Sequence, residues 1–185
     1  MKSHLKLFLF VICVAIASGP VLASEKERNK LRKTVKQTLS KLYEVQPSAK
    51  SAVEKAAGYA VFNNTGMKIL VTGGGRGKGI AVDNSTGKET FMKMVEVQAG
   101  LGMGIKKFNV IFVFENSTAL NDFVESGWQF GGQATAAAKS EEEGEALAGA
   151  VSVSPGVWIY QLTDKGLALE LTAKGTKYYK DDDLN

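Results

Sequence analysis

The spacing of apolar residues divides the chain into a helical front part and a strand-rich remainder. Between Leu31 and Leu42, leucine and valine recur every three or four positions, which is the stripe of an amphipathic helix. Pro47 is expected to end this helix, and Ser48 to cap a second, shorter helix that closes at a left-handed Gly58. Glycine marks the same boundary, because 19 of the 20 glycines lie from Gly58 onward.

After Gly58 the apolar pattern changes to the period of strands. Four short apolar runs are separated by turn residues, at 59–62, 68–71, 79–82 and 89–92. The most apolar run beyond residue 23, Phe108 to Phe114, is predicted to be a central strand. Ser117 is expected to cap a short helix closed by Gly127, and hairpins are expected at 83–87 and 164–166. These elements predict an α+β fold, with N-terminal helices packed on a curved, mostly antiparallel, glycine-rich β-sheet.

The first 23 residues have the composition of a removable export signal. Lys2 and Lys6 precede the apolar run 7–17. Val-Leu-Ala at 21–23 places small or compact residues just before the expected cleavage site. Eleven apolar residues are too few for a transmembrane helix, which needs about 20. We therefore predict three parts: a cleaved signal peptide (1–23), a helical segment (24–57) and a glycine-rich β domain (58–185) that forms one domain with the helices. The protein is expected in a periplasm or outside the cell, free or peripheral on a membrane.

Composition excludes much catalytic chemistry from the exported part. The chain has one histidine and one cysteine, His4 and Cys13, and both lie in the segment predicted to be removed. A Ser-His-Asp triad, a cysteine nucleophile, the usual zinc ligands and disulfides are then excluded together. We predict no enzyme, no cofactor and no metal site. An enzyme that uses carboxylates alone, such as Asp164 or Glu170, is a third alternative, although the sequence does not pair them.

Charge argues against nucleic acid as a partner. The whole chain has a formal net charge of +4, and removal of residues 1–23 takes away two lysines and no acidic residue, which leaves +2. A nucleic-acid-binding domain usually has a stronger basic footprint.

The stretch Gly73 to Gly79 contains two cations, Arg76 and Lys78, among five glycines. It does not fit a phosphate loop, because Gly79 stands where that motif needs a serine or threonine. The stretch also does not contain the spacing Gly-x-Gly-x-x-Gly of a dinucleotide-binding motif in any register. We interpret it as a glycine-rich strand with close backbone approach. A weaker alternative is that Arg76, Lys78 and nearby amides hold a lipid phosphate.

Three further patterns have plain structural interpretations. Glycine alternates with apolar residues over 100–104, which predicts a curved strand, with an acyl channel as the alternative. The acidic clusters 141–143 and 181–183 are expected to be a solvated loop and a frayed tail. Aromatic residues recur at strand period, and core packing is the expected role for them: Trp128, Phe130, Trp158 and Tyr160.

The front helix is basic as well as amphipathic. Between residues 26 and 41 it carries seven lysines and arginines and one glutamate. Such a helix can lie on an anionic membrane surface, with its apolar stripe in the headgroup boundary. The alternative is a helix docked on the sheet with a solvated lysine face. The apolar residues that either insert or dock are Leu31, Val35 and Leu39.

In the order of its motifs the chain resembles the SYLF-domain family, in particular its exported bacterial branch. The resemblance runs from about Val53 to Lys180. It rests on five segments in this order: 56–62, 73–79, 99–104, 127–131 and a closing hairpin from 165–167 to 175–177. The resemblance implies a lipid-binding domain. Eukaryotic members are similar to phosphoinositide binders that engage actin, but export makes actin an unexpected partner here.

These observations predict an exported, non-enzymatic protein that binds anionic phospholipid or a membrane surface through basic residues. The alternative is a scaffold or protein-interaction module of the cell envelope, without lipid binding. The residues predicted to bind lipid come from the front helix and the glycine-rich stretch: Lys30, Arg32, Lys33, Lys36, Arg76 and Lys78.

Overall fold

The computed structural model describes residues 19–69, 72–99, 104–130, 147–168 and 175–185. Three helices are described: α2 (Gly19–Val45), α3 (Ser48–Lys55) and α4 (Ser117–Glu125). Four long strands form the middle of the sheet: β1 (Gly58–Ile69), β2 (Thr72–Asp83), β3 (Glu89–Ala99) and β4 (Gly104–Phe114). Shorter strands complete it: β5 (Trp128–Phe130), β6 (Val151–Ser154), β7 (Val157–Thr163), β8 (Gly166–Ala168) and β9 (Thr176–Lys180).

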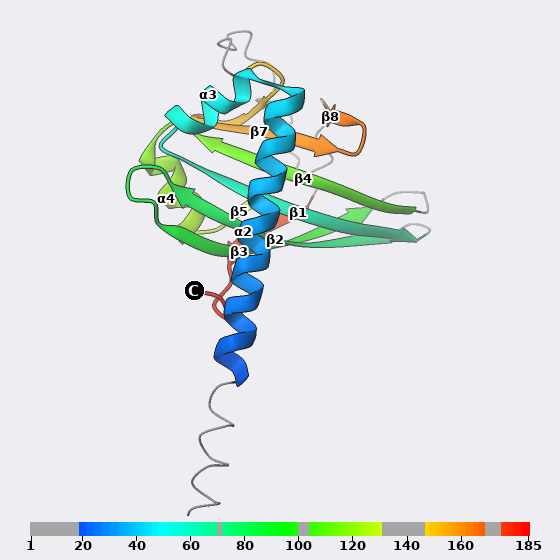
Figure 1. Cartoon of the computed structure of the whole chain (residues 1–185). Helices are drawn as coiled ribbons and strands as arrows, with labels where there is room; N and C mark the ends of the chain where they lie inside the picture. The colour runs from blue at the N-terminus through cyan, green and yellow to red at the C-terminus, as the bar shows by residue number, and fades with distance from the viewer. Residues whose placement is uncertain (1–18, 70–71, 100–103, 131–146, 169–174) are drawn as a thin grey trace, which may run out of the picture.

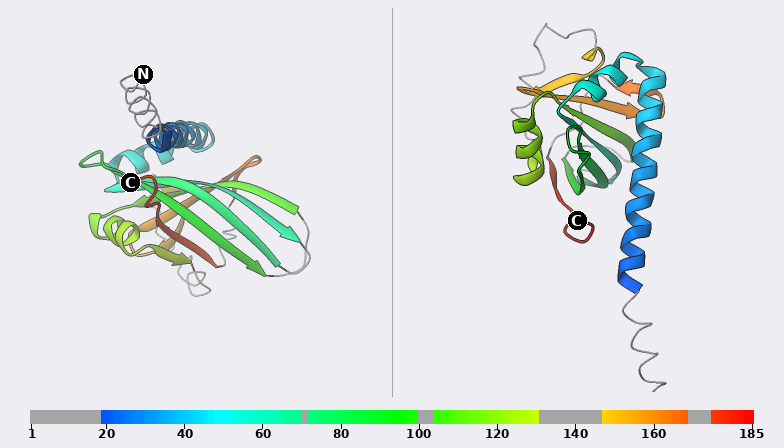
Figure 2. Two further views of the ribbon diagram at one scale, coloured as in Figure 1. Left: turned by 90° about the horizontal axis from the view of Figure 1, so that it is seen from below. Right: turned by 60° about the vertical axis from the view of Figure 1, so that its left-hand side comes forward.

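All of these strands belong to one curled antiparallel sheet. Its order is β5-β9-β3-β2-β1-β4-β7-β6, and β8 pairs with β7. The long helix α2 crosses one face of the sheet, while α4 covers the other face (Figures 1 and 2). The predicted α+β class, with helices packed on a curved antiparallel sheet, is therefore confirmed. The predicted central strand is also present, because β4 lies between β1 and β7.

Each face of the sheet has its own hydrophobic core. Beneath α4, aromatic rings pack edge to face; the centroids of Phe62 and Tyr178 lie 4.8 Å apart. Beneath α2 and α3, the core is mainly aliphatic and includes fully buried Leu42 and Ile111. Alternate residues along each strand point to opposite faces, so both sets of side chains come from the same strands. Because both faces are covered, the strands read as apolar runs rather than as a strict alternation.

The glycine-rich stretch lies inside β2, as the interpretation of close approach predicted. A Cβ atom at Gly77 would lie 2.7 Å from Met94 Cγ, and one at Gly79 would overlap the ring of Phe62. These glycines therefore leave room for large side chains of the neighbouring strands on the α4 side. Arg76 and Lys78 alternate with them and so project toward the opposite, α2 side of the sheet.

Several predicted helix ends were wrong by one residue or more. Ser48 is the first residue of α3 and makes no capping bond; its hydroxyl accepts a bond from Gln46 Nε2. Gly58 begins β1 and is not left-handed, and a Cβ there would lie 2.7 Å from Leu120 Cδ2. The cap of α4 is Asn116, whose Oδ1 accepts from the Ala119 amide at 2.9 Å.

The predicted turns agree with the structure more closely than the predicted helix ends. Gly127 has φ of 69° after α4, and the 83–87 connection joins β2 to β3 as a hairpin with Gly87 at φ 71°. The hairpin predicted at 164–166 is confirmed, because β7 and β8 pair with each other across this turn. The closing hairpin from 165–167 to 175–177 is wrong, because β9 lies between β3 and β5. Residues 1–18, 100–103 and 141–143 lie outside the described residues, and with them most of the predicted export signal.

Candidate anion-binding groove

A groove of about 350 Å³ lies between the N-terminal half of α2 and the neighbouring strands β1 and β2. Residues from all three elements line it: Glu27, Lys30, Leu31, Thr34, Asn63, Arg76, Gly77 and Lys78. The groove brings together two predicted basic patches, because Lys30 comes from the front helix and Arg76 and Lys78 come from the glycine-rich strand. No pattern in the sequence indicates that these patches are neighbours.

The three cations of the groove differ in their partners. Lys78 Nζ lies 2.6 Å from Glu27 Oε1, and the hydrogen bond to Glu27 raises the pKa of Lys78. Lys30 and Arg76 are exposed and form no ion pair with the described part of the chain. Among the described residues, the groove therefore contains one lysine paired with a carboxylate and two cations that are not paired.

The other predicted basic residues of α2 fall on different sides of the helix. Lys33 and Lys36 are exposed on its outward face. Arg32 points toward the sheet, where its Nε donates to Glu89 Oε2 at 2.8 Å and its guanidinium lies 5.5 Å from the centre of the Phe91 ring. The hydrogen bond to Glu89 raises the pKa of Arg32. Arg32 is therefore engaged within the protein, unlike Lys33 and Lys36.

The apolar stripe of α2 is docked on the sheet. Val35 is 9% exposed and belongs to the core beneath α2, and Leu31 and Leu39 pack against the same core. Of the two alternatives open for this stripe, the structure has the docked one. The outward face of α2 thus offers charge but no apolar stripe.

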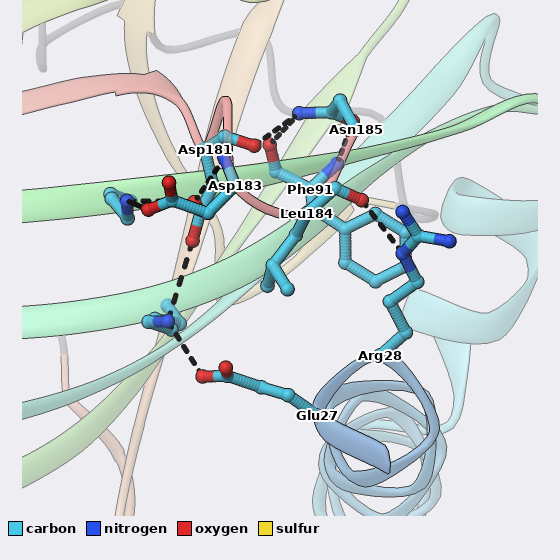
Figure 3. A network of polar contacts seen from close by, with 9 residues as sticks. Glu27, Arg28, Phe91, Asp181, Asp183, Leu184 and Asn185 are labelled. Carbon is cyan, nitrogen blue, oxygen red and sulfur yellow. Dashed lines mark hydrogen bonds and ion pairs between the residues drawn. The ribbon is translucent and has the colours of Figure 1, made fainter. Parts of the chain in front are cut away.

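The acidic segment, residues 181–185, is the main feature that the sequence analysis missed. The prediction of a frayed tail is wrong, because Asp181 is fully buried and ion-paired (Figure 3). Its Oδ1 lies 2.7 Å from Lys93 Nζ, and its Oδ2 lies 3.4 Å from Lys78 Nζ. Asp183 Oδ2 also reaches Lys93, at 2.8 Å. These contacts raise the pKa of Lys93, chiefly through Asp181, and Lys93 lowers the pKa of Asp183.

Hydrogen bonds hold the rest of the acidic segment between β3 and α2. Asn185 accepts from the Phe91 amide at 2.9 Å and donates to the Phe91 carbonyl at 2.8 Å. The carbonyl of Leu184 accepts from Arg28 Nε at 2.8 Å, and the Leu184 side chain is buried in the core beneath α2. Leu184 was the one sequence signal for this docking, since a solvated acidic tail has no need of a leucine.

The aromatic residues at strand period do not form one surface. Trp158 and Tyr160 are buried in the core beneath α2, while Trp128 packs against the core beneath α4. Core packing, as predicted, accounts for these three residues. A larger cavity of about 400 Å³ lies beside Trp128, between α4 and the β6–β7 turn. Among the described residues that line it, Asp122 is the only ionisable one, so this lining does not form a basic patch.

Within the ranges that the structure describes, no three histidine, cysteine, aspartate or glutamate side chains gather as a set of metal ligands. None of the helices described is long and apolar enough to span a membrane.

Comparison with known proteins agrees with the resemblance noted in the glycine motifs. Residues 95–185 match the sequence model of the Ysc84 family, described as "Las17-binding protein actin regulator". The chain is also 36% identical over 146 residues to "Beta cell expansion factor A" of Aeromonas veronii. That alignment covers 79% of this chain and 54% of the relative, so the chain spans about half the length of that protein. By its motifs, its matched residues and this relative, the chain belongs to the SYLF (Ysc84) family.

Proposed function

We propose that this protein is an exported, non-enzymatic binder of anionic phospholipid. The observation that carries the proposal is the groove in which Lys30 of α2 meets Arg76 and Lys78 of β2. Lys33 and Lys36 extend the positive charge along the exposed face of the same helix. A phosphate group held at the groove would leave these lysines free to face further anionic headgroups.

Charge, rather than insertion of apolar residues, would supply the affinity. Each lysine or arginine near an anionic bilayer contributes about 1 kcal/mol, and this attraction falls within a Debye length. Arg76 adds a planar guanidinium, which can donate two parallel hydrogen bonds to one phosphate. Because the apolar stripe of α2 is docked, we expect the protein to sit on the membrane surface.

Export and the family together guide the choice of partner. The family description speaks of an actin regulator, but an exported protein would meet envelope or extracellular membranes instead of actin. The name of the relative, a factor for beta cell expansion, agrees with a role outside the producing cell. We therefore propose anionic lipid as the binding partner, in preference to actin, nucleic acid or a small substrate.

The test is co-sedimentation of the protein, purified from its own cells, with vesicles of phosphatidylcholine and increasing phosphatidylglycerol. We expect bound protein to rise with the anionic fraction and to fall between low and physiological salt, as a basic surface requires. An absence of binding at every composition would contradict lipid binding. A single stoichiometric protein partner recovered from envelope extract would then favour the scaffold alternative.

A pair of matched charge reversals locates the binding surface. Lys33→Glu with Lys36→Glu reverses the outward face of α2, whereas Lys88→Glu with Lys165→Glu reverses two exposed lysines in turns between strands. Both variants change the net charge by the same amount. We expect the first to abolish vesicle binding and the second to reduce it slightly. Equal losses would contradict a specific role for the helix face.

A further inference from the structure

The buried carboxylate of Asp181 has the position of a ligand between two cations. It lies 2.7 Å from Lys93 Nζ on one side and 3.4 Å from Lys78 Nζ on the other, with no exposed surface of its own. The two lysines remain 27% and 38% exposed, so both can be approached from solvent. Lysine is also a common ligand of phosphate groups, which it attracts as a point charge.

We propose that Lys93 and Lys78 form a second anion site, which the chain's own acidic segment fills and which a lipid phosphate enters by displacing it. The proposal rests on the proposed function, because it describes how anionic lipid gains access to the full basic surface. Lys78 links the two places, since it lines the groove and also contacts Asp181. An anion bound in the groove would draw Lys78 away from Asp181.

The contacts that hold the acidic segment are of a kind that an anion can replace. Asp181 Oδ2 makes no hydrogen bond, and its contact with Lys78 is the longer of the two. Asp183, the second carboxylate on Lys93, has a side chain that is 83% exposed. Arg28, Lys78 and Lys93 all contact the segment, and Glu27 and Glu25 of α2 pair with Lys78 and Arg28. Two monoanionic lipid phosphates, or one dianionic inorganic phosphate, could therefore replace the two carboxylates without leaving a lysine unpaired.

The experiment uses three neighbouring aspartates that differ in their partners. Asp181→Asn and Asp183→Asn each remove a carboxylate from Lys93. Asp182→Asn removes the same charge from an exposed side chain that has no recorded ion pair among the described residues. Vesicles of phosphatidylglycerol and phosphatidylcholine are the probe. Each variant, like the wild type, is produced in and purified from the protein's own cells.

We expect Asp181→Asn to bind these vesicles about fivefold more tightly than Asp182→Asn, the effect of about one freed cation near an anionic surface. Asp183→Asn should show a smaller gain, and because this residue is exposed the variant tests the proposal even where Asp181→Asn fails to fold. Adding Lys93→Gln to Asp181→Asn should remove the gain. Equal binding by all three single variants would overturn the proposal.

Amide hydrogen exchange tests displacement directly. The Asp181 amide donates to the Phe91 carbonyl of β3, so its exchange reports whether the segment is docked. The amides of Leu184 and Asn185 donate to the Asp181 carbonyl, so their exchange reports whether the turn of the docked segment persists. We expect faster exchange at these amides with vesicles. Inorganic phosphate forms a separate arm; an equal effect there would identify the phosphate group itself, and an effect of vesicles alone would identify the lipid headgroup. No change with either probe would overturn the proposal.

The outcomes separate this inference from the proposed function. Wild-type protein that binds vesicles with no effect of the aspartate variants contradicts the second anion site and leaves lipid binding intact. Binding by Asp181→Asn where the wild type and Asp182→Asn do not bind supports both. If no variant binds vesicles, lipid binding and the second site are both wrong.

Discussion

The two halves of α2 are attached to the same sheet by different forces. Toward its C-terminal end, Val35 and Leu42 are buried in the aliphatic core. Toward its N-terminal end, the contacts are mainly polar: Glu27 with Lys78, Arg28 with the Leu184 carbonyl, and Arg32 with Glu89. One helix thus has an apolar anchor at one end and an exchangeable, charged attachment at the other.

The difference teaches which end can respond to a ligand. Apolar burial is not screened by salt and does not depend on the charge of a partner, and its strength follows the area removed from water. Ion pairs with partly exposed lysines are screened by salt and compete with any anion that arrives. The groove lies at the charged end, so ligand binding and attachment of the helix share residues there.

The largest effect is expected at the apolar end. Leu42→Ala removes a fully buried side chain from the core beneath α2, and such truncations cost about 2–5 kcal/mol in the free energy of unfolding. Denaturant unfolding at two salt concentrations measures it. The loss should be the same at low and high salt. A loss that salt reduces would contradict the apolar anchor.

A smaller effect is expected from the ion pairs of Arg32 at the charged end. Arg32→Gln breaks the 2.8 Å pair with Glu89 and the 3.3 Å pair with Glu25, and all three side chains are partly exposed. Partly exposed pairs contribute about 0.2–1 kcal/mol, and salt weakens them. The same denaturant series measures this variant. A destabilisation as large as that of Leu42→Ala would show that both ends of the helix are anchored with similar strength.

The smallest effect, and the most specific one, is expected from acid. Lys93 lowers the pKa of Asp183 below its ordinary value of 3.8, so this pair stabilises the protein above that value and the contribution disappears as pH falls through the lowered pKa. Lys93 has a raised pKa, so its own contribution is present below 10.5 and is lost only as pH rises through the raised value.

Melting temperatures of the wild type and Asp183→Asn across pH measure this dependence. The difference between the two proteins should be constant near neutral pH and should shrink below pH 3.8. A difference that persists in strong acid would show that Asp183 stabilises the fold by something other than its charge.

Much of the fold could be predicted because it follows from local patterns. The stripe from Leu31 to Leu42 gives α2 its docked face, and the run Phe108 to Phe114 gives β4 its place in the middle of the sheet. Exact helix ends were less accessible. Asn116 and Ser117 are both good caps, and only the backbone conformation selects Asn116.

The candidate site was predictable in its residues but not in its geometry. Lys30, Arg76 and Lys78 stand out as cations in the sequence, yet 46 positions separate Lys30 from Arg76, and no pattern shows that they line one groove. Lys93 has no distinguishing neighbours in the sequence at all. Its role depends on Asp183, which is 90 positions away.

The sequence by itself determined the helical and strand periods, the face of α2 that docks, and the need for glycine inside β2. These are properties of neighbouring residues, since side chains three, four or two positions apart must share a face. The tertiary structure decided which cations are neutralised. Arg32 and Lys78 meet carboxylates from distant segments, while Lys30, Lys33 and Lys36 of the same helix face solvent. Pairing of charges depends on distance in space, and only the packed sheet and the docked acidic segment set that distance.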